Sequence, residues 1–214
     1  MIYQYGLHVI YCIFILLTLS IYIAPYDVVQ GPISKVMYLH VPLAIASLLL
    51  FCVVLVMSTL AWVYHIKVAS HIASIAARCG TVATAITLIS GMIWGYYTWG
   101  TFWVWEPRLT TYLMLLFIYL AYLIMDKACQ EYLASKQSLM LLSIIGVMNV
   151  ILVHVSVNWW QSLHQQSSLL EVTNGALPIG ILLPLLLSIL FFALVVTYIC
   201  ARHILIKLES IYES

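Results

Sequence analysis

The stretch LHVPLAIASLLLFCVVLVMSTLAWVY, residues 39–64, contains no Lys, Arg, Asp or Glu. About 20 mostly apolar residues are enough for an α-helix to cross the roughly 30 Å hydrocarbon layer of a bilayer. A helix also satisfies its backbone N–H and C=O groups internally, which lipid requires of any spanning segment. This stretch therefore predicts a transmembrane helix.

Five further apolar stretches lie on either side of it, with no soluble domain between them. Of the 214 residues, 65% are apolar and 7% are charged, against about half and a quarter in soluble domains. We therefore expect an all-α integral membrane protein, a bundle of six transmembrane helices that forms a single domain over residues 1–214. The predicted spans are Leu7 to Ala24, Leu39 to Tyr64, Ile75 to Tyr97, Leu109 to Met125, Ser138 to Val157, and Leu177 to Ala201.

The distribution of Lys and Arg predicts the orientation of the bundle, because these residues are enriched in cytoplasmic loops. Lys35 and Arg108 fall on one side of the membrane. The other six fall on the opposite side: Lys67, Arg78, Lys127, Lys136, Arg202 and Lys207. We therefore expect both termini in the cytoplasm and three outer segments at about 25–38, 98–108 and 158–176.

Composition excludes several classes of function. The net charge of +1 comes from scattered residues, so there is no basic patch to follow a phosphate backbone and we expect no nucleic-acid partner. The five cysteines form no CxxC pair and no zinc-site spacing. The sequence also lacks the GxxxxGKS or GxxxxGKT motif of ATPases.

Tryptophans gather on the predicted outer side. Interfacial tryptophans usually occur at both membrane surfaces, so a distribution of six against one favours a dedicated aromatic surface. The centre of this surface is WGTFWVWEPRLT, residues 99–110. A flat hydrophobic ligand would suit it, although the same rings could anchor the protein in the headgroup region. The six outer tryptophans are Trp94, Trp99, Trp103, Trp105, Trp159 and Trp160.

Two geometries are open to the aromatic segment. Trp99 and Trp103 would share a face of a helix, whereas Trp103 and Trp105 would share a face of an extended chain. Pro107 disfavours helical geometry at the residue before it and prevents a regular helix through its first turn. We therefore expect an irregular turn before the fourth span, which is predicted to begin at Leu109.

Two histidines reach the same outer surface. His40 begins the second span in YLHVPLA, and His164 follows the fifth span in WWQSLHQ. Imidazole is a common axial ligand of haem iron, and two imidazoles beside an aromatic surface favour such a site over a structural role. His154, near the outer end of the fifth span, either belongs to the site or is a buried hydrogen-bonding residue.

Glu106 and Arg108 flank Pro107 in the aromatic segment. They could form a local ion pair that shapes the turn. An exposed ion pair contributes little to the stability of a protein. Alternatively, Arg108 binds a carboxylate of the ligand bidentately while Glu106 holds Arg108 in place. Neither alternative makes Glu106 a catalytic acid, and we expect a binding protein rather than an enzyme.

Three segments together resemble the tryptophan-rich WWD signature of haem-handling membrane proteins: MYLHVPLA (37–44), SGMIWGYYTWGTFWVWEPRLT (90–110) and VNWWQSLHQ (157–165). They are most similar to the haem exporter protein C family (CcmC) of cytochrome c maturation, along nearly the whole chain. The chain departs from the family pattern in having Glu106 in place of the usual Asp and Phe102 in place of a Trp. Carboxylate and aromatic ring are both retained.

This resemblance implies that His40 and His164 are the two axial ligands of a haem iron. It also implies an aromatic platform around the haem, with Trp94 and His154 as further candidates. The implied platform residues are Trp99, Gly100, Phe102, Trp103, Trp105, Glu106, Arg108, Trp159 and Trp160.

The family further implies that haem is held non-covalently (b-type) and transiently at the outer face, for delivery to the membrane-anchored haem chaperone CcmE. The ABC transporter subunits CcmA and CcmB and the small membrane protein CcmD would be its other partners. The expected location is the bacterial inner membrane, or the mitochondrial inner membrane if the protein is organellar.

The alternative is a subunit of a transporter that moves haem or another hydrophobic ligand across the bilayer. Such a protein would have polar residues near its helix centres, or broken helices, and Gly180 and Pro184 could break the sixth span. A membrane cytochrome, by contrast, would place its histidine ligands inside the spans. His40 and His164 lie at span ends.

Overall fold

The computed structural model describes the backbone of residues 2–132, 136–159 and 178–212. Within these ranges the chain is helical and contains no named strand. Each long helix is long and apolar enough to cross a membrane, which confirms the prediction of an all-α protein with six membrane-spanning helices. The helices, including one short 3-10 helix (η1), are α1 Ile2–Ile23, η1 Pro32–Val36, α2 Met37–Val63, α3 Lys67–Trp99, α4 Pro107–Tyr132, α5 Lys136–Trp159 and α7 Ile179–Tyr212.

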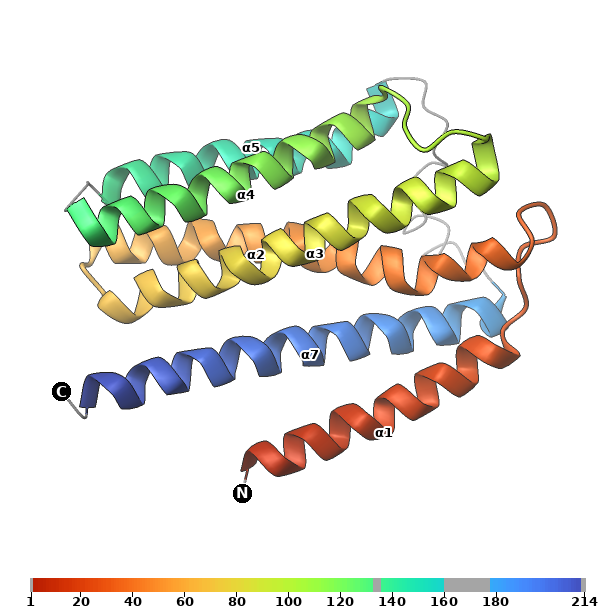
Figure 1. The fold of residues 1–214 in the computed structure, drawn as a ribbon, viewed down its shortest axis with the longest axis horizontal. Coiled ribbons are helices and arrows are strands. Elements are labelled where there is room, and N and C mark those ends of the chain that lie inside the picture. Colours follow the sequence, from red (N-terminus) through yellow and green to blue (C-terminus); the bar gives the residue numbers. More distant parts are fainter. Residues whose placement is uncertain (1, 133–135, 160–177, 213–214) are drawn as a thin grey trace.

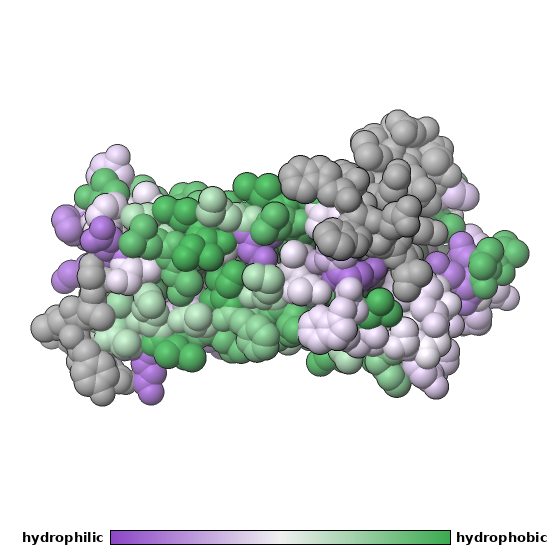
Figure 2. Space-filling model, turned by 90° about the horizontal axis from the view of Figure 1, so that it is seen from above, coloured by the Kyte–Doolittle hydropathy of each residue, from purple (hydrophilic) through white to green (hydrophobic). Residues whose placement is uncertain are grey.

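The long helices lie side by side along the long axis of the molecule (Figure 1). Helices α2 to α5 pack as a group of four, α7 contacts α2 and α3, and α1 lies at the edge against α7. Both ends of the chain lie toward one end of the bundle. The connection between α3 and α4 lies at the other, which we call the aromatic end. Figure 2 shows apolar residues over the middle of the visible face and more polar residues toward its two ends, as expected when the middle faces lipid.

Two helices extend well beyond the predicted spans. Helix α3 begins at Lys67 rather than Ile75, and α7 continues to Tyr212 rather than ending at Ala201. Hydropathy marks the part of a helix that crosses lipid, whereas the helix itself continues until a cap, Gly or Pro ends it. The connection between α2 and α3 is therefore reduced to residues 64–66, where His65 adopts a left-handed conformation with φ 55°.

The break that Gly180 and Pro184 could have made is absent. Helix α7 runs through both residues without interruption. Proline is tolerated in membrane helices where the neighbouring structure satisfies the backbone group that it frees, and Pro184 is buried. The feature that had favoured a broken transporter helix is thereby removed.

Two aromatic rings and two glycines fix the spacing of the four-helix group. Phe51 of α2 packs edge-on against Tyr119 of α4, with ring centroids 4.6 Å apart, and both side chains are fully buried. Phe51 lies over Gly146 of α5 and Tyr119 lies over Gly80 of α3, so closely that a Cβ at either glycine would overlap the ring. Small residues allow membrane helices to approach closely, and here they admit one ring each.

Buried polar groups join α4 to its neighbours. The hydroxyl of Tyr119 donates to the backbone carbonyl of Ser47 at 2.7 Å. Ser74 of α3 donates to the carboxylate of Asp126 at 2.7 Å, and Asp126 is only 4% exposed although the predicted fourth span ends at Met125. Because an unsatisfied polar group in lipid costs several kcal/mol, such pairs hold the helices in register.

Lys35 attaches the peripheral helix α1 to the bundle. Its Nζ donates to the carbonyl of Ile21 at 2.7 Å and to that of Tyr22 at 3.2 Å. The last carbonyls of a helix lack partners within the helix, and a cation there also meets the negative end of the helix dipole. Lys35 therefore caps the end of α1 from the η1 segment.

We expect Lys35→Met to destabilise the protein by about 1 kcal/mol, because a hydrogen bond from a charged donor typically contributes about that much or more. The measurement is the thermal unfolding temperature in detergent. Lys67→Met is the matched control, since Lys67 is exposed at the start of α3. Equal unfolding temperatures for the two variants would refute the capping role.

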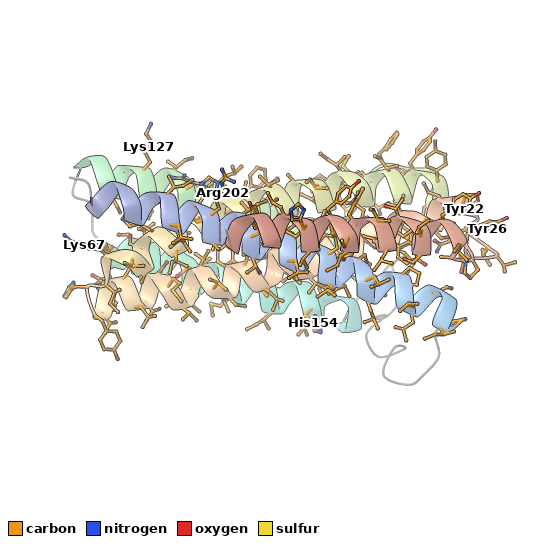
Figure 3. All side chains as sticks on the ribbon, turned by 90° about the horizontal axis from the view of Figure 1, so that it is seen from below. Tyr22, Tyr26, Lys67, Lys127, His154 and Arg202 are labelled. Atoms are coloured by element: carbon orange, nitrogen blue, oxygen red, sulfur yellow. The ribbon has the colours of Figure 1, made fainter. Side chains whose placement is uncertain are left out.

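Three basic residues lie toward one end of the bundle and two tyrosines toward the other. Figure 3 shows Lys67, Lys127 and Arg202 toward one end, and Tyr22 and Tyr26 toward the other. The cationic end is the end toward which both chain termini lie. This is the asymmetry that the positive-inside rule uses, and the cytoplasmic location of the termini stays a prediction.

Candidate functional site

A glycine and a proline delimit the aromatic segment. Helix α3 ends at Trp99, and Gly100 follows in the left-handed conformation (φ 77°, ψ 8°), donating its N–H to the Tyr96 carbonyl at 2.9 Å. Glycine adopts this conformation without steric cost. Pro107 is the first residue of α4, a position where its missing N–H is not needed. The prediction that Pro107 prevents a regular first turn is therefore wrong, and α4 begins before Leu109.

The rings of the segment face in different directions. Trp103 and Trp105 lie in the non-helical part with ring centroids 5.4 Å apart at 79°, so the extended alternative is the correct one. Trp99 instead belongs to α3 and packs against Gly95. Phe102 stacks on Tyr96 with centroids 4.2 Å apart.

These rings differ in exposure: two lie at the exposed surface, which we call the rim, and one lies in the wall of a pocket. Trp105 is 76% exposed and Phe102 is 52% exposed. Trp103 is partly buried and lines a pocket together with His40. The structure thus brings one tryptophan of the segment to the histidine and leaves Trp105 and Phe102 on the exposed rim.

The pocket lies between α2, α3 and α4 at the aromatic end. About 370 Å³ of space between its lining residues is not filled by atoms, and this figure includes the open mouth of the pocket. Most of its lining is apolar, and its ionisable groups are one imidazole, one guanidinium and one phenol. The lining residues are His40, Thr87, Leu88, Gly91, Met92, Trp103, Arg108, Leu109 and Tyr112.

The imidazole of His40 is held by residues of α3. Its Nδ1 lies 3.1 Å from the hydroxyl of Ser90. The ring of Trp94 packs edge-on against it, with centroids 5.9 Å apart, and the Trp94 indole N–H donates to Gln30 at 2.8 Å. Gly91 leaves room for the ring, since a Cβ there would lie 2.9 Å from its Cε1. His40 is therefore presented in one orientation.

Two buried hydrogen-bond donors in the pocket wall could bind a polar group of a ligand. Among the described residues, the indole Nε1 of Trp103 and the hydroxyl of Thr87 have no hydrogen-bond partner. Arg108 adds a cation to the same wall, and the negative charge of the buried Glu106 attracts this guanidinium. Buried polar groups are normally paired, so a ligand with a carboxylate would complete this wall.

Several predicted site residues are not among the described residues of this pocket. His164 and Trp160 lie outside the described residues, as does the side chain of Trp159, which ends α5. His154 is exposed on α5 (Figure 3), and it is not among the described residues that line the pocket. Its alternative interpretation as a buried hydrogen-bonding residue is therefore wrong.

Sequence reasoning named Trp94 of α3 as a candidate but missed the other residues that α3 brings to His40 and the pocket. Thr87, Ser90, Gly91 and Trp94 recur at the spacing of one helix face, and all four contact His40 or line the pocket. The signal was available in the segment SGMIWG, which lies directly before the aromatic segment. Its small residues carry no group that by itself indicates a ligand site.

Comparison with known proteins agrees with the resemblance. Residues 2–211 match the family model described as "Heme exporter protein C". The "Heme exporter protein C" of Haemophilus influenzae is 36% identical over 192 residues, which cover 89% of this chain and 77% of that protein. The Escherichia coli K12 protein of the same name is 37% identical over 148 residues, which cover 69% of this chain and 60% of that protein.

A plant relative extends the comparison beyond bacteria. The "Putative cytochrome c biosynthesis ccmC-like mitochondrial protein" of Marchantia polymorpha is 38% identical over 169 residues, which cover 79% of this chain and 71% of that protein. A family model that spans residues 2–211 and relatives at these identities lead to one conclusion. This chain belongs to the haem exporter protein C family.

Proposed function

We propose that this protein binds haem as its cargo at the aromatic end of the bundle, with His40 as one axial ligand and His164 as the other. At the coarser level, family membership makes it a membrane component of haem handling in cytochrome c maturation. The observation that carries the finer proposal is the oriented imidazole of His40 in an apolar pocket that also contains Arg108 and unpaired donors.

The chemistry of the pocket suits each part of haem. Leu88, Met92 and Leu109 offer an apolar surface to the macrocycle, and imidazole is a common iron ligand. The guanidinium of Arg108 can bind a propionate bidentately. The Trp103 indole and the Thr87 hydroxyl would pair with the same carboxylates.

The exposed rim suits transfer rather than permanent storage. Trp105 and Phe102 project from the aromatic end with large exposed fractions, so part of a bound macrocycle would remain accessible to an acceptor. We infer that the acceptor is a haem chaperone of the CcmE type. CcmA, CcmB and CcmD would form the remaining complex, with haem held non-covalently and transiently.

We also propose an orientation of the bundle in the membrane. With both termini in the cytoplasm, the aromatic end faces the periplasm of a bacterium or the intermembrane space of a mitochondrion. Family membership includes both settings, since the relatives are bacterial and plant mitochondrial. The protein itself contributes binding and positioning, and no catalytic step is assigned to it.

The test is the visible absorption spectrum of the detergent-purified protein, with a pyridine haemochrome assay. It compares the native chain with His40→Ala, His164→Ala and the double variant. We expect a bis-imidazole Soret and α/β pattern in the native protein and its loss in the double variant. The readout of delivery is covalent loading of the chaperone in the same cells.

The control variant is His154→Ala, because His154 is exposed and outside the pocket lining. It should keep the native spectrum. If the double variant retained the native spectrum and chaperone loading, the haem site would be refuted. A native protein that carries no haem under haem-replete conditions, with its partners present, would favour a transporter subunit instead.

A further inference from the structure

Ser90 lies between its own helix and the histidine of the pocket. It is 5% exposed, and its Oγ lies 2.7 Å from the carbonyl of Ile86 and 3.1 Å from that of Thr87. The same oxygen lies 3.1 Å from Nδ1 of His40, which comes from α2. Ser90 is thus the side chain through which α3 contacts the imidazole nitrogen.

Counting protons fixes the direction of this hydrogen bond. A serine hydroxyl has one proton to donate, whereas a carbonyl can only accept. The shorter contact, 2.7 Å to Ile86, therefore takes the hydroxyl proton of Ser90. The Ser90 oxygen faces His40 with a lone pair, so Nδ1 must carry the proton and donate it.

The tautomer of His40 follows from this arrangement. In a neutral imidazole one nitrogen carries a proton and the other keeps a lone pair. With the proton on Nδ1, the lone pair is on Nε2. The opposite arrangement, in which Ser90 donates to Nδ1, would leave the Ile86 carbonyl without the hydroxyl proton and would protonate Nε2, which could then not bind iron.

We propose that Ser90 is a positioning residue that holds His40 in the Nδ1–H tautomer and so presents Nε2 to the iron of the cargo. This inference rests on the proposed function, in which His40 is an axial ligand. Metal-binding histidines usually donate their second ring N–H to a neighbour, which fixes the tautomer and makes the ligand more basic. Ser90 supplies that neighbour, while Gly91 and Trp94 confine the ring on other sides.

The experiment compares Ser90→Ala with Ser90→Thr in the full-length protein. Ser90→Ala removes the acceptor, and we expect haem affinity to fall about tenfold, the lower end of the usual effect of losing such a partner. The ferric–ferrous midpoint potential should rise, because a less basic imidazole stabilises ferric iron less. Ser90→Thr keeps the hydroxyl and should restore both quantities.

Ser143→Ala is the matched control. Ser143 is fully buried on α5 and donates to the Met140 carbonyl at 2.7 Å, so it has the same kind of bond within its own helix but does not line the pocket. It should leave haem affinity and midpoint potential unchanged. A Ser143→Ala variant with the same shifts would overturn the positioning role, since loss of a buried serine alone would then explain them.

The His40→Ala variant separates the two proposals. If His40→Ala keeps the native spectrum, the proposed function fails and the role of Ser90 fails with it. If His40→Ala loses the spectrum while a folded Ser90→Ala keeps native affinity and potential, the inference alone is wrong.

A rescue measurement covers the case in which Ser90→Ala does not fold. In His40→Gly, where Ser90 is native, added imidazole can bind iron through one nitrogen and donate to Ser90 from the other. The compound 1-methylimidazole can bind iron but has no N–H to donate. We expect imidazole to restore haem binding at a concentration several times lower. Equal restoration by both compounds, or none by either, would contradict the proposal.

Discussion

Alanine at Gly80 is expected to destabilise the protein by about 3 kcal/mol, the upper end of the usual range for overpacking a core. The new Cβ would overlap the ring and hydroxyl of Tyr119. That ring cannot move aside freely, because its hydroxyl bonds to Ser47 and its face meets Phe51. Helices α3 and α4 would therefore have to separate.

The same result is expected for Gly146→Ala, where the Cβ would overlap the buried ring of Phe51. Each glycine lies against one ring of the same packed pair. Their effects should therefore not add, since residues that share packing partners are coupled. Thermal unfolding in detergent, with the yield of monodisperse protein, measures the two single variants and the Gly80→Ala, Gly146→Ala double variant.

Gly6→Ala is the matched control for both substitutions. It also introduces alanine into a membrane helix, but its Cβ would lie at an ordinary contact distance of 3.6 Å from Tyr198. Alanine favours a helix more than glycine does, so this variant should be as stable as the native protein or slightly more stable. Native stability in the Gly80 and Gly146 variants would show that the ring packing does not set the helix spacing.

The fold was predictable because lipid restricts what a chain can do. Backbone groups in a bilayer must pair within the segment, so hydropathy alone located all six helices. It could not locate their ends, since α3 begins with the polar run after Lys67. Nor could it show that Gly80 and Gly146 each face an aromatic ring, because that depends on which helices become neighbours.

The site was predictable in its chemistry and less so in its geometry. His40, Trp103 and Arg108 were identified from residue type and resemblance, and the structure brings these three to one pocket. The single aromatic platform stays a prediction: Trp103 packs against Trp105 in the non-helical segment, whereas Trp99 belongs to α3, which ends at Gly100. The residue type of Ser90 did not mark it, since a serine within a helix usually bonds to its own backbone, and only its spacing from Gly91 and Trp94 places it on the pocket face.

Gly91→Ala is expected to lower haem affinity by about tenfold or more, comparable to the loss of a residue that supports a ligand. The new Cβ would lie 2.9 Å from Cε1 of His40, closer than side-chain atoms normally approach. The imidazole borders the pocket and can give way into it, so we expect the bundle to stay folded. The measurements are haem titration by Soret absorbance and thermal unfolding of the same sample.

The contrast with Gly80 makes this expectation specific. At Gly80 the obstructed ring is enclosed by three helices, so the strain must appear as lost stability. At Gly91 the obstructed ring borders a cavity, so the strain must appear as a displaced ligand. Excess imidazole should therefore restore a low-spin spectrum to Gly91→Ala but leave the unfolding temperature of Gly80→Ala unchanged. A folded Gly91→Ala protein with native haem affinity would contradict the role of His40 as an iron ligand held against Gly91.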